Sequence, residues 1–432
     1  MIFLYNLIFP IVLLFYLPGN IYKYLKRGGV KKNYLERFAI FSEDKKRELD
    51  NIKGRRIWIH AVSVGETQLA IDFIKALAKS DTAYNFIIST TTTTGQELAV
   101  NKLKNLAAVI FCPLDYFLFV RKTINLINPE ILIIIETELW PSMIYEAHRK
   151  AIRIAQVNAR ISDRSFKMYK IFSCFVKPFV SLINVSCAQT QTDAQRLNLI
   201  CPSLNIVETG NMKFDQSLPE EISDICLEEF FGKGSFIYII GASTHPGEEK
   251  LIIGIYKKLL NDFNNLRLIL VPRHAERAKD ILKELKKAQI PYLRKSNNSK
   301  WGTDTILCLL ADTTGEMHAL MQLSDIVIMC KSFAGNAGGH NIIEPALLGK
   351  AIITGRELSN FRFVMKIMLD KNAILGVTDN EIEDAIRKLI ENPAERTKLG
   401  ETAKSIVLQN TGAINRTVKE IEKLIKKHVS NK

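Results

Sequence analysis

The run Ile57-Trp-Ile-His-Ala-Val-Ser-Val-Gly-Glu66 indicates how this chain is built. Its first part, Ile57 to Val62, is apolar enough for a buried strand, and Thr67 to Lys79 has the apolar periodicity of a helix. A glycine and a carboxylate separate the two. A second junction that combines glycine with a carboxylate, Gly338-Gly-His-Asn-Ile-Ile-Glu-Pro345, lies more than a domain length further along. We therefore expect two α/β halves whose loops meet over one cleft, one holding a nucleotide and the other carrying the chemistry.

Short aliphatic strands alternate with amphipathic helices on both sides of an acidic, proline-containing linker, Gln216 to Glu229. The alternation predicts two Rossmann-like domains, 33–215 and 230–430, each with a parallel, doubly wound sheet. The further expected strands are Asn85–Thr90, Ile131–Ile135, Phe236–Gly241, Leu266–Val271, Ile326–Met329 and Ala351–Thr354, and the further expected helices are Gly95–Lys104, Glu248–Leu260 and Ala275–Ala288.

The composition limits the class of protein and of partner. The 432 residues are 47% hydrophobic, which suffices for two buried cores and excludes a disordered or collagen-like chain. Lys and Arg outnumber Asp and Glu by 59 to 45, so an anionic surface, a phosphate or an acidic sugar is the expected partner. The sequence has no aromatic-basic motif and no zinc-finger spacing, so we expect no nucleic acid. The seven scattered cysteines include no C-x-x-C pair and are expected to be reduced thiols.

The N-terminal segment has the features of an uncleaved membrane anchor, which we assign to residues 1–20. Ile2 to Leu17 carries no charge, whereas five basic residues lie between Lys23 and Lys32. This order of charges differs from that of a cleaved signal peptide and places the following domains in the cytoplasm. The run is short against the roughly 20 residues that span a bilayer and contains Pro10, so a monotopic helix in the interface is the alternative to a single-pass span.

Carboxylates at the ends of expected strands are the candidates for chemistry in the first half. Glu66 begins a helix, where it can either project toward a ligand or serve as an acidic first-turn residue. Glu136 directly follows the buried strand Ile131–Ile135, and a carboxylate there is costly unless it faces a cleft or a partner. Glu138 would lie on the same face as Glu136 if the strand period of two continues, so it is a candidate for the same reason. Two convergent carboxylates can divide the work of taking a proton and stabilising positive charge.

Lys213 lies near the expected hinge, where an ammonium group can meet a phosphate or carboxylate. In the second half, Arg273 follows an expected strand and is suited to clamp a phosphate, whereas Gly315 suits a tight turn. Asn341 and Glu344 follow the last glycine loop, and a carboxylate there can accept two ribose hydroxyls.

Other sequence signals have simpler explanations. Thr90 to Thr94 could bind an anion, but a helix cap suffices. The sequence lacks a Walker A loop, a G-x-G-x-x-G loop and an H-E-x-x-H pair, which lowers the support for ATP hydrolysis, nicotinamide chemistry and a metal site. We expect His60, His245, His274 and His340 to order loops through hydrogen bonds.

Taken together, these motifs resemble those of the membrane-anchored 3-deoxy-D-manno-octulosonic acid (Kdo) transferases of lipopolysaccharide synthesis. The likeness covers nearly the whole chain and rests, besides the anchor, on seven ordered motifs: Trp58-Ile-His-Ala-Val-Ser-Val-Gly-Glu66, Glu136-Thr-Glu-Leu-Trp-Pro141, Asn158-Ala-Arg-Ile-Ser162, Gly210-Asn-Met-Lys-Phe-Asp215, Gly241-Ala-Ser-Thr-His-Pro-Gly-Glu-Glu249, Val271-Pro-Arg-His274 and Gly338-Gly-His-Asn341. The resemblance implies a GT-B fold and an inverting transfer of Kdo from CMP-Kdo to a lipid A precursor, lipid IVA, at the cytoplasmic face of the inner membrane.

The resemblance also implies roles for individual residues. Glu66 matches the family's general base, and Glu136 and Lys213 match positions that stabilise the transition state. The residues that match CMP contacts are Pro272, Arg273, Gly315, Glu316, Met317, Asn341, Ile342, Ile343 and Glu344. No cofactor and no metal ion is implied.

The chain departs from the family pattern at two positions. Ile342 stands where the family commonly has proline, and Lys331 where a glycine often begins the last loop. Two other functions remain open. A nucleotide-sugar epimerase of the non-hydrolysing kind has the same fold but needs no anchor and no lipid. A membrane-tethered basic binding module would tolerate the loss of Glu66.

Overall fold

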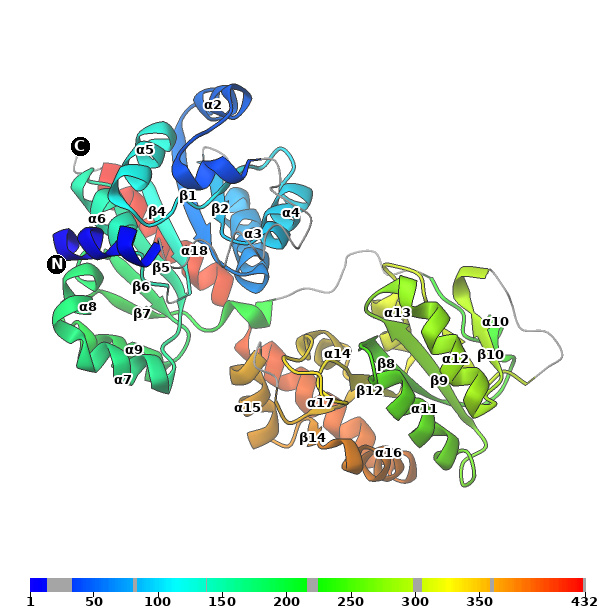
Figure 1. Ribbon diagram of the computed structural model, residues 1–432. Coiled ribbons are helices and arrows are strands. Elements are labelled where there is room, and N and C mark those ends of the chain that lie inside the picture. The colour runs from blue at the N-terminus through cyan, green and yellow to red at the C-terminus, as the bar shows by residue number, and fades with distance from the viewer. Residues whose placement is uncertain are drawn as a thin grey trace. The chain divides into compact units, whose positions relative to one another are not determined.

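The computed structural model describes residues 1–13, 33–80, 84–136, 138–215, 224–297, 305–357 and 361–429. The chain forms two compact units, which are described one at a time (Figure 1). The first comprises Met1–Asp215 and Thr411–Lys432, and the second Gln216–Asn410.

The first unit is built on a parallel seven-stranded sheet with the order β3-β2-β1-β4-β5-β6-β7. Its strands are β1 (Arg55–Ala61), β2 (Tyr84–Thr90), β3 (Ala107–Phe111), β4 (Ile131–Ile135), β5 (Arg153–Ala159), β6 (Val185–Ala188) and β7 (Ile206–Glu208). The central strands are buried on both faces, which explains their almost continuous apolar sequences. Ile131–Ile135 agrees in full with the predicted strand, and the other predicted strands of this half differ from the observed ones by one or two residues at their ends.

Helices cover both faces of this sheet, as the doubly wound prediction requires. Alternate residues of β1 enter different cores: Ile57 and Ile59 pack with α3, whereas Trp58 packs with α5 and α6. The helices of the unit are η1 (Tyr34–Phe38), α2 (Glu43–Asp50), α3 (Val64–Ser80), α4 (Thr93–Lys102), α5 (Phe117–Ile127), α6 (Pro141–Arg149), α7 (Asp163–Ile171), α8 (Ser173–Val180), α9 (Gln191–Ile200), η2 (Met212–Asp215) and α18 (Ala413–Val429).

The second unit repeats the design with the strand order β10-β11-β9-β8-β12-β13-β14, again parallel throughout. Its strands are β8 (Ile237–Thr244), β9 (Leu266–Pro272), β10 (Tyr292–Arg294), β11 (Cys308–Leu310), β12 (Ile326–Met329), β13 (Ala351–Gly355) and β14 (Leu375–Val377). Its helices are α10 (Glu228–Phe231), α11 (Glu248–Leu259), η3 (Ala275–Arg277), α12 (Ala278–Ala288), η4 (Lys295–Asn297), α13 (Met317–Leu323), α14 (Ile343–Leu347), α15 (Arg362–Asp370), η6 (Asp379–Glu381), α16 (Ile382–Glu391) and α17 (Pro393–Asn410).

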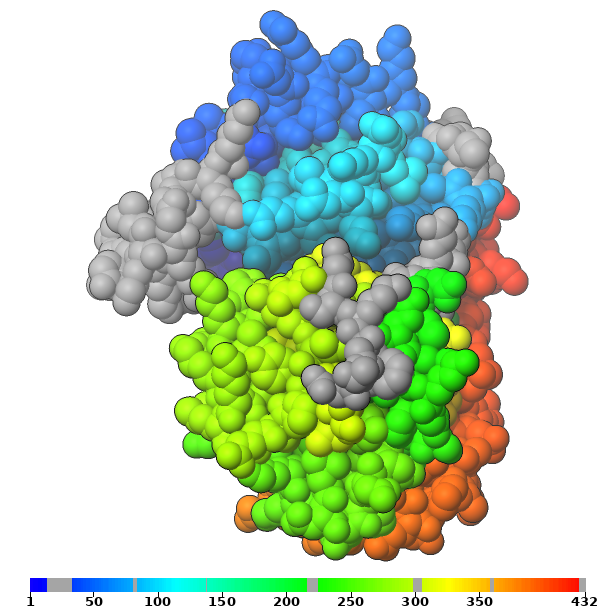
Figure 2. All heavy atoms as spheres, turned by 90° about the vertical axis from the view of Figure 1, so that its right-hand side faces the viewer, coloured from blue at the N-terminus to red at the C-terminus, as the bar shows by residue number. Residues whose placement is uncertain are grey.

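The space-filling view shows the side of the second unit that carries the first half of its sequence, in green to yellow (Figure 2). Residues of its last helices, in orange, lie along the border of that face. This placement follows from the strand order, which puts β10 and β14 at opposite edges of the sheet.

The C-terminal helix corrects the predicted domain boundary. A second domain of 230–430 was expected, but residues from Thr411 onward belong to the first unit. Helix α18 packs against α3 and places Ile421 and Ile425 in the same core as β1. Asp215 fixes its start by accepting hydrogen bonds from backbone N–H groups of Gly412 and Ile414. The apolar face of α18 gives no indication of which unit it covers, so the sequence could not place it.

The N-terminal segment is described only in part. Residues 2–13 are helical, and the rest of the predicted anchor, 14–20, lies outside the described residues. Tyr5 donates to Asp115 over 2.9 Å, and Asn6 accepts from Ser142 over 3.2 Å, so this helix is docked on the first unit. Among the described residues, no helix combines the length and the apolar character needed to cross a bilayer.

Two smaller expectations are confirmed. All seven cysteines are free, and only Cys174 and Cys226 are exposed. Thr92 caps α4 by accepting from the backbone N–H of Gly95, as the simpler explanation of the threonine run requires. The predicted linker, Gln216 to Glu229, ends in the short helix α10, and residues 216–223 lie outside the described ranges.

Candidate functional site

Glu66 lies in the first turn of α3, and its carboxylate turns back toward the loop that precedes the helix. One oxygen accepts from the Val62 backbone N–H and the other from the Ser63 hydroxyl, both over 2.8 Å. The side chain is only 8% exposed. Burial raises the pKa of Glu66 to about 7, the Val62 N–H works against that rise, and the charges of Glu136 and Glu138 add to it. A carboxyl group with this pKa is half ionised near neutral pH, which suits a general base.

Glu136 follows β4 and adopts a left-handed backbone conformation, with φ of 60°. Its backbone N–H still donates to Val157 of the neighbouring strand over 2.9 Å, so the chain turns out of the sheet directly after this bond. Its carboxylate forms an ion pair with Lys213 at 3.1 Å, in which both side chains remain partly exposed. A non-glycine residue held in this conformation is strained and is typical of positions where a side chain is aimed at a ligand.

Lys213 is positioned by the segment around η2. The side chain of Asn158 accepts from the backbone N–H of Met212 over 3.0 Å, and Asn211 accepts from that of Lys213 over the same distance. Asn158 is fully buried and has φ of 56°. Sequence reasoning gave no role to Asn158; the only signal was its place in a family-like motif.

The structure therefore brings the three catalytic candidates into one electrostatic group on the first unit. Glu136 is paired with Lys213, and its charge acts on Glu66. Glu138 belongs to the same group, because burial and the charge of Glu136 raise its pKa.

His60, expected to order a loop, lies within β1, and its hydrogen bond joins it to the neighbouring strand β2. Its imidazole is buried, hydrogen-bonds to the Ser89 hydroxyl over 3.0 Å and packs edge-on against Trp140. Burial lowers the pKa of His60 to about 4, so the ring is neutral. The buried indole N–H of Trp140 has no partner among the described residues.

In the second unit, the candidate binding residues lie in loops at the carboxyl ends of neighbouring parallel strands. Pro272 ends β9 and Arg273 follows it, with the Arg273 backbone N–H donating to Thr244 at the end of β8. Gly315, with φ of 90°, lies between β11 and α13. Since these strands are adjacent in the sheet, the loops meet at one edge.

Two of the candidates are held by side chains from other elements. The carboxylate of Glu316 pairs with Lys295 and accepts from the Thr313 hydroxyl. The sulfur of Met317 accepts from the Ser243 hydroxyl over 3.2 Å. Ser243 therefore ties the start of α13 to the end of β8.

Asn341 and Ile342 directly precede α14, and Ile343 and Glu344 are its first two residues. Glu344 accepts from the Asn341 amide over 2.9 Å and pairs with His318 at the same distance. This contact raises the pKa of His318. Ile342 and Ile343 are fully buried, so only their backbone groups can reach a ligand. The sequence gave no signal for His318, because α13 and α14 are separated by a strand and a loop.

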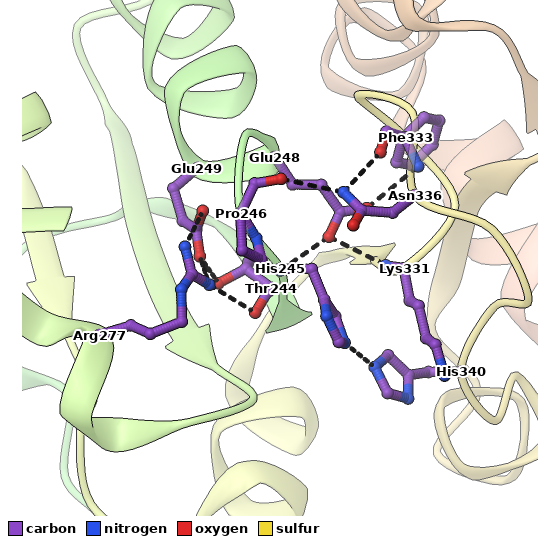
Figure 3. Close-up of polar contacts among 10 residues, drawn as sticks. All are labelled: Thr244, His245, Pro246, Glu248, Glu249, Arg277, Lys331, Phe333, Asn336 and His340. Carbon is purple, nitrogen blue, oxygen red and sulfur yellow. Dashed lines mark hydrogen bonds and ion pairs between the residues drawn. The ribbon is translucent and has the colours of Figure 1, made fainter. Parts of the chain in front are cut away.

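The carboxylates of Glu248 and Glu249 hold the loops of the second unit together (Figure 3). Glu248 is fully buried and accepts from the backbone N–H groups of His245, Lys331, Ser332 and Phe333. Glu249 accepts two hydrogen bonds from Arg277 and one from Thr244. Sequence reasoning had seen this stretch only as a glycine-containing junction.

Among the described residues, no group of three or more His, Cys, Asp or Glu side chains is arranged to hold a metal ion. The carboxylates of Glu136, Glu249, Glu316 and Glu344 are instead paired with basic side chains, and that of Glu248 with backbone N–H groups.

Comparison with solved structures bears on the fold alone. A glycosyltransferase from Rickettsia africae matches with a TM-score of 0.54 and 13% identity, over 88% of this chain and all of that one. A UDP co-structure of MnaA from S. aureus matches with a TM-score of 0.53 and 14% identity, over 86% of this chain and 97% of that one. These matches support the two-domain α/β part of the expected GT-B-type fold.

Comparison of sequences identifies the family. The model for the Kdo transferase N-terminal domain matches residues 32–216. The 3-deoxy-D-manno-octulosonic acid transferase of Haemophilus influenzae is 30% identical over 86% of this chain and 88% of its own length. That of Rickettsia felis is 32% identical over 85% of this chain and 79% of its own. The chain therefore belongs to the 3-deoxy-D-manno-octulosonic acid transferase family.

Proposed function

We propose that this chain is an inverting glycosyltransferase that moves Kdo from CMP-Kdo to a lipid A precursor, lipid IVA. The observation that carries the proposal is the state of Glu66, a buried carboxylate whose pKa is about 7 beside the Glu136–Lys213 ion pair. An acceptor hydroxyl must lose its proton as it attacks, and a base that titrates near neutral pH is suited to take it.

The other charged candidates can balance the charges that the sugar and the phosphate carry during the reaction. As the bond between Kdo and the phosphate breaks, positive charge develops on the sugar, and the Glu136 carboxylate can stabilise it. Lys213 can offset the sugar's own carboxylate. In the second unit, Arg273 and the loops of Gly315 to Met317 and Asn341 to Glu344 would hold the CMP, with Glu344 toward the ribose hydroxyls. Because arginine and lysine meet the anionic groups, the proposed reaction assigns no step to a metal ion.

Attachment to the cytoplasmic face of the inner membrane is part of the proposal. The N-terminal helix exposes several large apolar side chains, including Phe3 at 80%, Leu7 at 58% and Ile11 at 56%. In the sequence, basic residues from Lys23 to Lys32 follow the apolar segment and would favour an anionic lipid surface. A lipid acceptor makes such a location useful.

The test is to incubate the full chain with CMP-Kdo and lipid IVA in detergent and to record product masses. We expect the mass of lipid IVA to increase by whole Kdo units. Glu66→Gln should abolish transfer and retain CMP binding, because the base and the nucleotide candidates lie on different units. Glu208→Gln, an exposed carboxylate on β7, is the matched control and should leave the rate unchanged. Equal loss of transfer and CMP binding in Glu66→Gln contradicts the proposed division of roles.

The two alternatives predict other outcomes. An epimerase would be stabilised by a UDP-sugar rather than by CMP-Kdo in a thermal shift assay. A binding module would retain its function in Glu66→Gln.

A further inference from the structure

Lys331 occupies a backbone conformation that favours glycine. It lies two residues after the end of β12 and has φ of 64°, in the left-handed region where a Cβ is unfavourable. Two hydrogen bonds hold it there: its N–H donates to the Glu248 carboxylate over 2.9 Å, and its carbonyl accepts from the Gly339 N–H over 2.9 Å. The loop thus holds a strained residue in place, and the lysine side chain is the feature that a glycine would lack.

The Lys331 side chain extends beside a pair of imidazoles (Figure 3). The Nε2 atoms of His245 and His340 are 3.0 Å apart, and their ring planes are inclined by 27°. At this distance one nitrogen donates a proton and the other accepts, so at least one ring is neutral. Burial and the charges of Lys331 and Arg273 lower the pKa of both rings, that of His340 to about 4.

Among the described residues, the main charges that lower the pKa of these two rings are positive. His245 is influenced by Lys331, His274, Arg277 and Arg273, and His340 by His245, Lys331 and Arg273. The carboxylates of Glu248 and Glu249, which follow His245 in the chain, are engaged elsewhere, since Glu248 accepts hydrogen bonds from four backbone N–H groups and Glu249 pairs with Arg277.

Lys331 and Arg273 consequently remain uncompensated. Within the described part of the chain, neither side chain forms an ion pair with a carboxylate. Three features therefore coincide at one sheet edge: two uncompensated cations, an imidazole pair in which at least one ring is neutral, and a strained backbone that holds one of the cations in place. Such an arrangement is suited to bind an anionic ligand, whose charge would compensate the two cations.

We propose that Lys331, Arg273 and the His245–His340 pair form one anion site that receives the phosphate of the nucleotide-sugar donor. The inference rests on the proposed function and adds Lys331 and the two histidines to the donor site. When the bond between the sugar and the phosphate oxygen breaks, its electron pair stays on that oxygen and the phosphate becomes a dianion. The cations stabilise this charge, and the imidazole pair takes up one proton from the acid form of the buffer, which is left as its conjugate base.

This site makes nucleotide binding dependent on pH. A bound dianion favours the protonated form of the histidines, so the complex holds more protons than the free protein. CMP affinity should therefore fall as pH rises from 6.5 to 8.5, a range in which the phosphate of CMP, with a second pKa of about 6, is mostly dianionic.

The test uses the full chain, CMP and isothermal titration calorimetry. Lys331→Met removes the charge and keeps the strained Cβ, whereas Lys331→Gly removes both. We expect each to weaken CMP binding about tenfold, a typical loss for one close charge. Lys331→Gly should unfold at a higher temperature than Lys331→Met. Lys257→Met, an exposed lysine at the far end of α11, is the matched control and should bind CMP as the wild type does.

Protonation provides a second readout. Titrations in buffers of different ionisation enthalpy should show proton uptake on CMP binding by the wild type near pH 7, and none by His340→Gln. Free Kdo, which carries a carboxylate and no phosphate, should bind the wild type and Lys331→Met equally.

The outcomes are distinguishable. If the wild type binds no CMP, the proposed donor is wrong and the proposed function fails with it. If the wild type binds CMP and both Lys331 variants bind it equally well, only this inference is refuted. A loss confined to free Kdo would also refute it, because the site would then hold the sugar's carboxylate.

Discussion

The rate of Kdo transfer should follow the ionisation of Glu66. Burial and neighbouring carboxylates raise the pKa of Glu66 to about 7, and only the ionised form can accept the acceptor's proton. With that pKa, half of the molecules are active at pH 7 and about a tenth at pH 6, so the single-turnover rate should fall about fivefold between these two values. It should rise about twofold between pH 7 and pH 8.

Replacing Glu136 should shift the pH dependence of the transfer rate. The negative charge of Glu136 contributes to the raised pKa of Glu66, so Glu136→Gln should shift the midpoint to lower pH, whatever it does to the maximal rate. The assay is product mass against time with enzyme in excess, and a thermal melt at each pH confirms that the protein is folded. A rate that does not change between pH 6 and pH 8, or that rises as pH falls, refutes Glu66 as the base.

Ionisation of Glu66 should also lower the free energy of unfolding. The pKa of Glu66 is raised from its usual 4.5 to about 7, so the folded state binds the proton more tightly than the unfolded state. Stability should therefore decrease as pH rises from 4.5 to 7 and then level off. A shift of this size corresponds to about 3 kcal/mol above pH 7. The variant Glu66→Gln cannot ionise and should avoid this loss of stability. It also loses part of the hydrogen bonding from Val62 and Ser63, which offsets some of the stability that it gains.

Denaturant unfolding of the wild type and Glu66→Gln at pH 5 and pH 8 isolates the effect. Glu36 and Asp115 also have a raised pKa, but their contribution is common to both proteins. We expect Glu66→Gln to gain stability relative to the wild type at pH 8 and to gain much less at pH 5. The same relative stability at both pH values would show that Glu66 is not desolvated in the folded protein.

Three further predictions follow from packing and surface features. Gly400→Ala should destabilise the second unit by about 2 kcal/mol or more, because a Cβ would lie 2.0 Å from the Gly349 carbonyl oxygen. Gly254→Ala in α11, where a Cβ would have nothing within 4 Å, is the control and should be neutral or slightly stabilising. Thermal melts of the two variants measure the difference. Leu7→Asp should reduce cosedimentation with anionic vesicles while leaving CMP binding unchanged, and equal sedimentation would contradict a membrane role for this helix. Asp215→Asn should weaken the docking of α18, because the charge that holds the N–H groups of Gly412 and Ile414 is lost, and hydrogen exchange should then increase in α18 more than in α3.

Much of the fold could be predicted because its strands are buried on both faces. An apolar run such as Ile131–Ile135 leaves little choice of structure or of location, and the sequence predicted it to the residue. Helix α18 has the same kind of apolar face as the helices of both units, and its docking depends on Asp215, nearly two hundred residues earlier. Contacts of that separation are not visible in local periodicity.

The site was predictable in type but not in arrangement. Carboxylates that follow buried strands marked Glu136, yet its pairing with Lys213 depends on how Asn158 holds the segment of η2. The two sequence-level explanations of Glu66 turn out to be compatible, because the carboxylate accepts bonds at the start of α3 and still has a raised pKa. Lys331 was seen only as a departure from the family pattern, since its uncompensated charge depends on what Glu248 and Glu249 bind.

The two units position their site residues by the same device at the carboxyl edge of each sheet. The pairing of β5 with β6 shifts register between Gln156 and Ala159, and that of β8 with β9 shifts between Ala242 and Thr244. Each shift contains one left-handed residue, Asn158 in the first unit and Ser243 in the second. Such irregularities re-aim a side chain that would otherwise face a core. Asn158 then holds the segment that carries Lys213, and Ser243 contacts Met317, so in both units a break in the strand ladder connects the sheet to the residues proposed to act on the substrate.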